Sequence, residues 1–139
     1  MSCVLRAAGE SFDVAAFLAE SPFRPHAVYG RGEPLPGGLV TDRVRSASGF
    51  DLTVSEAGLS DRDGQIVDAI VFLDQHEDEL RRLGGFPGVD VVSLDFAVAR
   101  REVVAQTESF PSDLLWRAGA LDIALAITHY AVADGRQAS

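Results

Sequence analysis

The stretch that most constrains the fold lies near the end of the chain, from Leu121 to Val132 (LDIALAITHYAV). Large apolar side chains alternate there with small or polar ones, and a repeat of two is typical of a β-strand with one buried face. The large residues are Leu121, Ile123, Leu125 and Ile127, and the residues between them are Asp122, Ala124, Ala126 and Thr128. We therefore predict a strand in this stretch.

A second stretch, Val89 to Ala99, has the same pattern. Its alternating residues are Val92, Leu94, Phe96 and Val98 on one face and Ser93, Asp95 and Ala97 on the other. Two strands with matching apolar faces can bury them in one core. We expect these two strands to lie side by side in a sheet.

A helix is the alternative for Leu121 to Val132. Its residues have good helix propensity, and Ile123, Ile127 and Tyr130 also satisfy a helical spacing. Gly119 separates the stretch from the preceding helical segment, and the alternation is unbroken over eight residues. Both features favour the strand.

The first half of the chain predicts one short helix and several short strands. The strands are expected at Cys3 to Ala8, Ala27 to Tyr29, Val40 to Arg45 and Gly49 to Glu56. The last two are either separate short strands or one extended ribbon with a kink at residues 46–48. The helix has Val14, Phe17 and Leu18 as its buried stripe, with Ser11 or Asp13 as its cap.

The second half predicts a long helix and a shorter one. Apolar residues at spacings of three and four run from Gln65 to Leu83, and the aspartates at 61 and 63 suit the start of that helix. The segment SFPS, residues 109–112, is typical of a helix start and predicts a helix from Ser112 to Ala118.

This order of elements predicts an α+β fold. Its first six elements follow the split β-α-β pattern of ferredoxin-like two-layer sandwiches, with about five mostly antiparallel strands and helices on one face. A chain of 139 residues is expected to form a single domain. Residues 133–139 are predicted to be a polar, flexible tail.

Several of these segments resemble a family of small bacterial proteins known only as a domain of unknown function. The resemblance includes Ser21-Pro22 after the early helix, Gly32-Glu33, the helix from Gln65, and the SFPSDLL segment at 109–115 before the last strand. It implies an α+β sandwich and no catalytic residues. Some relatives of this kind lie beside bacterial toxin genes, so the resemblance also implies an immunity role.

Composition limits the classes of partner. The formal net charge is −9, and all 12 basic residues are arginine, so a phosphate backbone or an anionic membrane would be repelled. The start of the chain has no signal-peptide pattern, no apolar run is long enough to span a membrane, and the single Cys3 fits a reducing cytoplasm. We expect a cytoplasmic protein that binds no nucleic acid and no membrane.

No motif in the chain predicts a cofactor or a metal. The glycine-rich loop Gly30 to Gly38 has Leu35 where a dinucleotide-binding loop needs its third glycine, and there is no lysine for a P-loop. Asp61 to Gly64 resembles part of a calcium loop, but Ile70 replaces its glutamate. His76-Glu77 resembles a zinc-peptidase motif, but Leu80 replaces the second histidine.

The first functional hypothesis is a non-catalytic protein-interaction module, of the immunity or antitoxin type. Small side chains on the second face of the two alternating strands would make a flat surface that a second copy or another protein could cover. This predicted interaction face consists of Ser93, Asp95, Ala97, Ala124, Ala126 and Thr128.

The alternative is a small ligand-binding protein or hydrolase that uses the Gly30 to Gly38 loop. Arginine beside a glycine-rich loop can bind a carboxylate or phosphate, and a histidine can transfer protons. The residues proposed for this site are His26, Tyr29, Arg31, Glu33, Arg43 and Arg45. Nothing in the sequence places these groups together. A metal site is the weakest hypothesis, because the three histidines have no paired ligand spacing.

Overall fold

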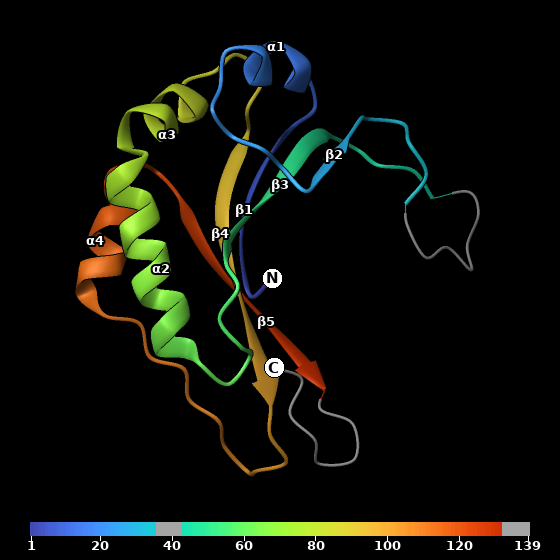
Figure 1. Ribbon diagram of the computed structural model, residues 1–139. Coiled ribbons are helices and arrows are strands. Elements are labelled where there is room, and N and C mark those ends of the chain that lie inside the picture. The colour runs from blue at the N-terminus through green and yellow to red at the C-terminus, as the bar shows by residue number, and fades with distance from the viewer. Residues whose placement is uncertain (36–42, 132–139) are drawn as a thin grey trace.

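A central strand from the start of the chain organises the sheet. This strand, β1, pairs antiparallel with β3 on one side and with β4 on the other, while β2 and β5 form the outer edges in the order β2-β3-β1-β4-β5 (Figure 1). The structure is a computed structural model, and it describes residues 1–35 and 43–131. The strands are β1 Cys3–Gly9, β2 Ala27–Tyr29, β3 Ser48–Ser55, β4 Val91–Arg100 and β5 Ala124–Ala131.

The sheet is mixed, because β4 and β5 run parallel whereas the other three pairings are antiparallel. Helix α4 (Ser112–Ala120) connects β4 to β5 and returns the chain to the end of the sheet where β4 begins. The fold is therefore α+β. Its strand order is not the classic ferredoxin-like one, because β5 is added in parallel beyond β4.

The strand predicted near the end of the chain is confirmed from Ala124 to Ala131. Leu125 lies opposite Leu94 and Ile127 opposite Phe96, as expected of two apolar faces in one core. The prediction is wrong before that point. Leu121 caps α4 instead, and Asp122 has a φ of 58° in the turn between helix and strand.

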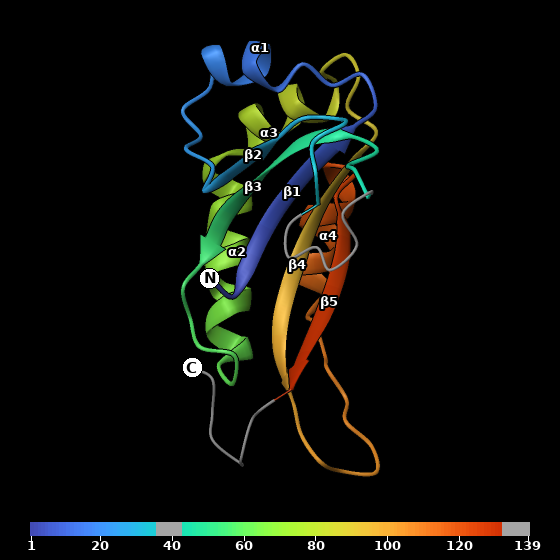
Figure 2. The same cartoon turned by 90° about the vertical axis from the view of Figure 1, so that its right-hand side faces the viewer.

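The four helices found in residues 1–35 and 43–131 lie on one side of the sheet (Figure 2). They are α1 Val14–Ala19, α2 Arg62–Gln75, α3 Glu77–Gly84 and α4. The predicted caps are confirmed: the Asp13 carboxylate accepts from the amide of Ala16 at 3.1 Å, and that of Asp61 accepts from the amide of Gly64 at 2.9 Å.

The single long helix predicted from Gln65 to Leu83 is wrong, because the chain breaks at His76. Its φ of −117° and ψ of 24° end α2 and start α3. The imidazole packs against the rings of Phe23 and Phe72, with centroids 5.4 and 4.8 Å away. Three consecutive acidic residues, 77–79, follow the break, and negative charge stabilises the first turn of a new helix.

The core lies between the sheet and the helices, and phenylalanines fill one end of it. Phe17 on α1 is fully buried and stacks on Phe50 of β3, with ring centroids 6.0 Å apart. Phe86 contacts the Phe17 ring edge-on, with centroids 5.3 Å apart. The guanidinium of Arg82 lies 4.0 Å from the centroid of the Phe17 ring. This cluster anchors α1 to the sheet.

Four predicted segments lie partly or wholly outside the described residues. They are the loop 30–38 beyond Leu35, the strand 40–45 before Arg43, the strand 121–132 at Val132, and the tail 133–139. The segments on either side of the first gap pair through backbone hydrogen bonds, which form a short antiparallel ladder. Gly32 donates to the carbonyl of Arg45 at 2.9 Å, and Arg45 donates to that of Glu33 at 2.8 Å. No helix in the described part of the chain is both long and apolar enough to cross a bilayer.

Cys3 is buried in β1, and its thiol should be inert in the folded protein. Burial raises the pKa of this thiol to about 12 from its ordinary value of 9.0, and the charges of Asp95 and Asp68 add to the effect. At pH 8 we expect a thiol reagent such as DTNB to modify native Cys3 more than about 100-fold more slowly than the urea-unfolded chain, because the thiolate is the reacting species.

The same shift predicts a loss of stability in alkaline solution. Between pH 9.0 and about 12 the unfolded chain releases the Cys3 proton and the folded chain retains it. The free energy of unfolding should therefore fall with rising pH in that range. Urea titrations of the wild type and of Cys3→Ala measure this effect. Equal pH slopes for the two proteins would contradict it.

Candidate functional site

The main candidate site is the face of the sheet that carries no helix among the described residues, and we call it the open face (Figure 2). Side chains alternate along each strand, so the residues that flank the core positions of β1, β3, β4 and β5 point to this face. The residues of the open face are Val4, Arg6, Ala8, Asp51, Thr53, Ser93, Asp95, Ala97, Ala124, Ala126, Thr128 and Tyr130.

The structure brings the six residues of the predicted interaction face together. Because β4 and β5 are neighbours in register, these residues form three opposing pairs on the open face. The pairs are Ser93 with Ala124, Asp95 with Ala126, and Ala97 with Thr128. Along β4 and β5 they make one strip, in which the side chains other than that of Asp95 are small. Their role in binding stays a prediction.

A charged cluster lies at the centre of the open face. The guanidinium of Arg6 on β1 hydrogen-bonds the carboxylate of Asp95 on β4, and its Nε lies 3.4 Å from Asp51 Oδ1 on β3. Thr128 on β5 donates its hydroxyl to Asp95, with 2.8 and 2.9 Å to the two carboxylate oxygens. Four strands are therefore linked through one arginine and one aspartate.

The electrostatics of this cluster leave one acceptor unsatisfied. Burial opposes the charge on Arg6, but the hydrogen bond to Asp95 and the charges of Asp51 and Asp95 raise the pKa of the guanidinium overall. Asp51 Oδ1 is buried and has an ion pair with Arg6 but no hydrogen bond, because the Arg6 contact lacks hydrogen-bond geometry.

An aromatic group borders the cluster on the β2 side. The guanidinium of Arg45 lies 3.9 Å from the ring centroid of Tyr29, within cation–π range. A side chain at Gly49 would come within 2.6 Å of the Tyr29 hydroxyl, so only glycine fits under this ring. Burial raises the pKa of the Tyr29 phenol, and Asp51 adds to the shift while Arg45 and Arg6 oppose it.

The six residues proposed for a ligand site do not converge on one point. Tyr29 and Arg45 contact each other, and the carboxylate of Glu33 accepts from the amide of Gly30 at 2.6 Å. His26 lies instead beside Thr53, with 3.0 Å between its Nδ1 and the hydroxyl. The remaining two residues, Arg31 and Arg43, are exposed on the ladder that continues β2.

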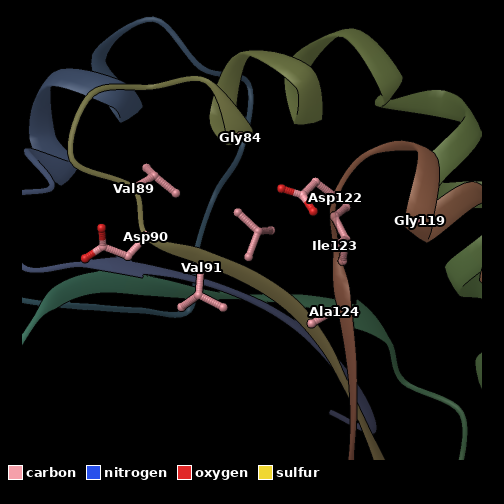
Figure 3. A pocket seen from close by; sticks show the side chains of 9 residues that line it. Gly84, Val89, Asp90, Val91, Gly119, Asp122, Ile123 and Ala124 are labelled. Atoms are coloured by element: carbon pink, nitrogen blue, oxygen red, sulfur yellow. The ribbon is translucent and has the colours of Figure 1, made fainter.

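A hollow of about 370 Å³ lies where β4 and β5 begin (Figure 3). Asp90 and Asp122 border it, and Gly84 and Gly119 mark the ends of the two helices that reach it. Helix carboxyl ends and carboxylates both favour a cation. Both aspartates are exposed to solvent, however, and Asp90 already accepts from the amide of Glu10 at 3.0 Å.

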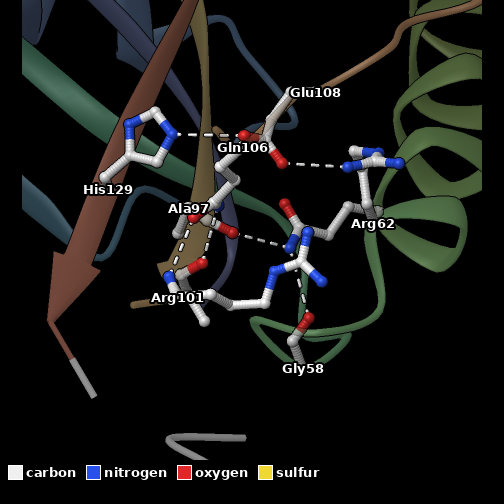
Figure 4. Close-up of polar contacts among 9 residues, drawn as sticks. Gly58, Arg62, Ala97, Arg101, Gln106, Glu108 and His129 are labelled. Atoms are coloured by element: carbon white, nitrogen blue, oxygen red, sulfur yellow. Dashed lines mark hydrogen bonds and ion pairs between the residues drawn. The ribbon is translucent and has the colours of Figure 1, made fainter. Parts of the chain in front are cut away.

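A second polar cluster joins the loop after β4 to the rest of the fold (Figure 4). The nearly buried carboxylate of Glu108 lies between Arg62 Nη1 at 3.0 Å and His129 Nε2 at 3.3 Å. The fully buried Gln65 donates to the carbonyls of Ala97 at 2.8 Å and Gly58 at 3.2 Å. The Glu108 contacts hold the loop against α2 and β5, and the Gln65 bonds join α2 to β4 and to the segment before α2.

Sequence reasoning missed the two charged residues at the centre of the open face, Arg6 and Asp51. A signal for them existed. Arg6 interrupts the apolar stretch CVLRAA, and a charged residue in the middle of a strand needs a partner. Asp51 and Asp95 likewise stand between apolar residues in the alternating pattern of their own strands, so they point to the same face of the sheet as Arg6.

In the part of the chain that the structure describes, no three histidine, cysteine, aspartate or glutamate side chains gather as a metal site. Comparison with known proteins found no matching family model, no matching curated protein and no matching solved structure. What the chain does must therefore be inferred from its fold and its open face.

Proposed function

We propose that this protein is a non-catalytic protein-interaction module that binds its partner through the open face. The observation that carries the proposal is the contrast between the two sides of the sheet. The four helices of the described part of the chain cover one side, while the other side presents small side chains around the linked charges of Arg6, Asp51 and Asp95. Charged groups at an interface steer the encounter and fix the register of the two proteins, so a sheet face with linked charges suits recognition of an oppositely charged partner.

The charges support binding more than stability. Replacing an ion pair that is removed from water by apolar residues is often neutral for stability or stabilising, so such pairs add little to the fold itself. In the Arg6 cluster, Asp51 Oδ1 is buried, but the Asp51 side chain as a whole is 21% exposed. The net charge of −9 would steer a basic partner toward this protein. We infer a partner that places an arginine or lysine against the exposed part of the Asp51 side chain.

A cytoplasmic immunity or antitoxin role fits a small acidic module that captures a basic protein. The ferredoxin-like relationship of the fold belongs to the same proposal. Its support is that β1 lies between β3 and β4 and pairs antiparallel with both, with α1 and α2 in the connections that follow β1 and β3.

The test compares two arginine substitutions on opposite sides of the protein. Ser93→Arg places a long charged side chain beside Arg6 on the open face, and Val67→Arg places the same side chain on the exposed side of α2. Tagged wild type and both variants are used to recover binding proteins from the host lysate. We expect one stoichiometric protein with the wild type and Val67→Arg, reduced at least tenfold with Ser93→Arg.

Circular dichroism of both variants checks that they remain folded. Equal recovery with the two variants would contradict binding through the open face. Recovery of no stoichiometric protein by the wild type would contradict the interaction module itself.

A further inference from the structure

The hollow at the start of β4 and β5 is continuous with the open face. Ala124 lines the hollow and belongs to the open face, and Val91 extends that face by one more position of β4, two residues before Ser93. Val92 and Ile123 line the hollow from the side of the core, and each is 6% exposed. The hollow therefore reaches from the strip of small side chains on the open face to the margin of the core.

The size and the walls of the hollow suit one long side chain. Apart from two glycines and two aspartates, the residues that line it are aliphatic. Its volume of about 370 Å³ is near the lower end of the range of ligand pockets, which is about 300 to 1,000 Å³. Aliphatic walls favour a stem of methylene groups, and long cationic side chains bury such a stem while the charged end stays near water.

One carboxylate at the hollow is free to bind. Figure 3 shows the side chain of Asp122 directed across the hollow toward Val89. Among the described residues, no donor is bound to this carboxylate. Asp90 is directed away from Asp122 and accepts from the amide of Glu10. Asp122 is therefore the group that a cation in the hollow would meet.

Two helix ends add negative charge to the same place. α3 ends at Gly84 and α4 ends just after Gly119, and both glycines line the hollow. The carboxyl end of a helix carries a partial negative charge. The arginines in the last turns do not neutralise it. Arg81 and Arg82 pair with glutamates of α3, and Arg117 pairs with an aspartate of α2. The hollow therefore favours a positively charged group from outside the chain.

An arginine side chain fits these features better than a lysine or a bare metal ion. A guanidinium forms two parallel hydrogen bonds with one carboxylate and has further donors for helix carbonyls. The ammonium of lysine is a strongly hydrated point charge. A metal ion gains nothing from aliphatic walls and needs more ligands than the single free carboxylate of Asp122.

We propose that the hollow anchors one arginine side chain of the partner. This inference rests on the proposed function, because the arginine enters beside Val91 and Ala124 while the rest of the partner covers the open face. A standard interface covers about 800 Å² of each protein, a disc roughly 30 Å across. Asp95 lies about 13 Å along β4 from Val91, so one partner reaches both the Arg6 cluster and the hollow. A buried arginine is a common source of interface affinity.

An arginine probe tests the hollow without the partner. The probe is N-acetyl-arginine amide, added to the isotope-labelled full chain and followed through the NMR shifts of the backbone amides. We expect saturable shifts in residues 89–92 and 119–124, with a Kd of about 10 mM or lower. N-acetyl-citrulline amide has nearly the same shape without the charge and should cause no such shifts. No shifts around the hollow, or equal shifts with citrulline, would overturn the proposal.

Two variants test the role of the carboxylate. Asp122→Asn preserves the backbone, because asparagine also tolerates the left-handed φ of 58° at this position. It should weaken binding of the arginine probe about tenfold. Glu102→Gln removes the same charge from an exposed residue beyond the far end of β4 and should leave binding unchanged. Equal binding by Asp122→Asn and the wild type would overturn the proposal.

The same variants separate the anchor from the proposed function once the wild type has recovered a partner. Titration calorimetry with that partner should show about tenfold weaker binding by Asp122→Asn and unchanged binding by Glu102→Gln. Loss of the partner by Ser93→Arg together with full affinity of Asp122→Asn would overturn the anchor and leave binding through the open face supported. A wild type that recovers no partner would overturn the proposed function, and the hollow then stands or falls with the arginine probe.

Discussion

Replacing Phe17 by alanine should lower the free energy of unfolding by about 4 kcal/mol, the largest effect expected of a single substitution in this chain. The ring is fully buried and contacts Phe12, Phe50 and Phe86. Removing it leaves a cavity that these rings cannot fill, and it removes the surface on which Arg82 lies. Urea unfolding followed by circular dichroism measures the change.

Two matched variants show whether the loss of stability comes from the buried volume at position 17 rather than from the loss of any apolar side chain. Phe17→Leu keeps most of the buried volume and should cost about 1.5 kcal/mol. Val67→Ala alters an exposed apolar residue on α2 and should change stability by less than about 0.5 kcal/mol. A cost for Phe17→Ala as small as that for Val67→Ala would contradict the proposed core.

Replacing Arg6 by methionine should destabilise the protein by about 2 kcal/mol, the second large effect. The variant keeps two carboxylates, Asp51 and Asp95, and removes the cation between them. Breaking a fully buried pair costs about 3–5 kcal/mol, and the 42% exposure of the Arg6 side chain reduces the cost. Urea unfolding at pH 7 measures it.

The complementary variant removes all three charges of the cluster. Arg6→Met with Asp51→Leu and Asp95→Leu should recover the wild-type stability to within about 1 kcal/mol, because no unpaired carboxylate remains. The same variant should lose the partner that the wild type recovers. A triple variant less stable than Arg6→Met would show that the cluster serves the fold rather than binding.

The sequence predicted the sheet better than the helices, for a physical reason. Alternation with a period of two is local, and the stretches around Leu94 and Leu125 satisfied it over many residues. It cannot show strand direction, because parallel and antiparallel neighbours share the same alternation. The parallel pairing of β4 and β5 depends on the path of α4, which only the folded chain reveals.

The break at His76 was hidden by tertiary contacts. The apolar spacing continues through that residue, so the sequence alone predicts one helix from Gln65 to Leu83. The ring of His76 instead packs against Phe23 and Phe72, one of them distant in the sequence. The three acidic residues at 77–79 were the available signal for a new helix start.

The candidate site was predicted in part. The strip of small residues on β4 and β5 followed from the alternation alone, since Ser93 and Ala126 must share a face once the strands are in register. The charged centre did not follow, because Arg6, Asp51 and Asp95 come from three strands whose order was not known. The ligand hypothesis depended on residues close in sequence, and the structure separates His26 from Arg45.

The most direct measurement for the open face is its accessibility to a maleimide in the free protein and in the complex with the recovered partner. Ser93→Cys reports the open face and Val67→Cys the helical side, while the buried Cys3 adds no background. We expect the partner to slow labelling at position 93 at least tenfold and to leave position 67 unchanged. Slower labelling at 67 with full labelling at 93 would contradict the account.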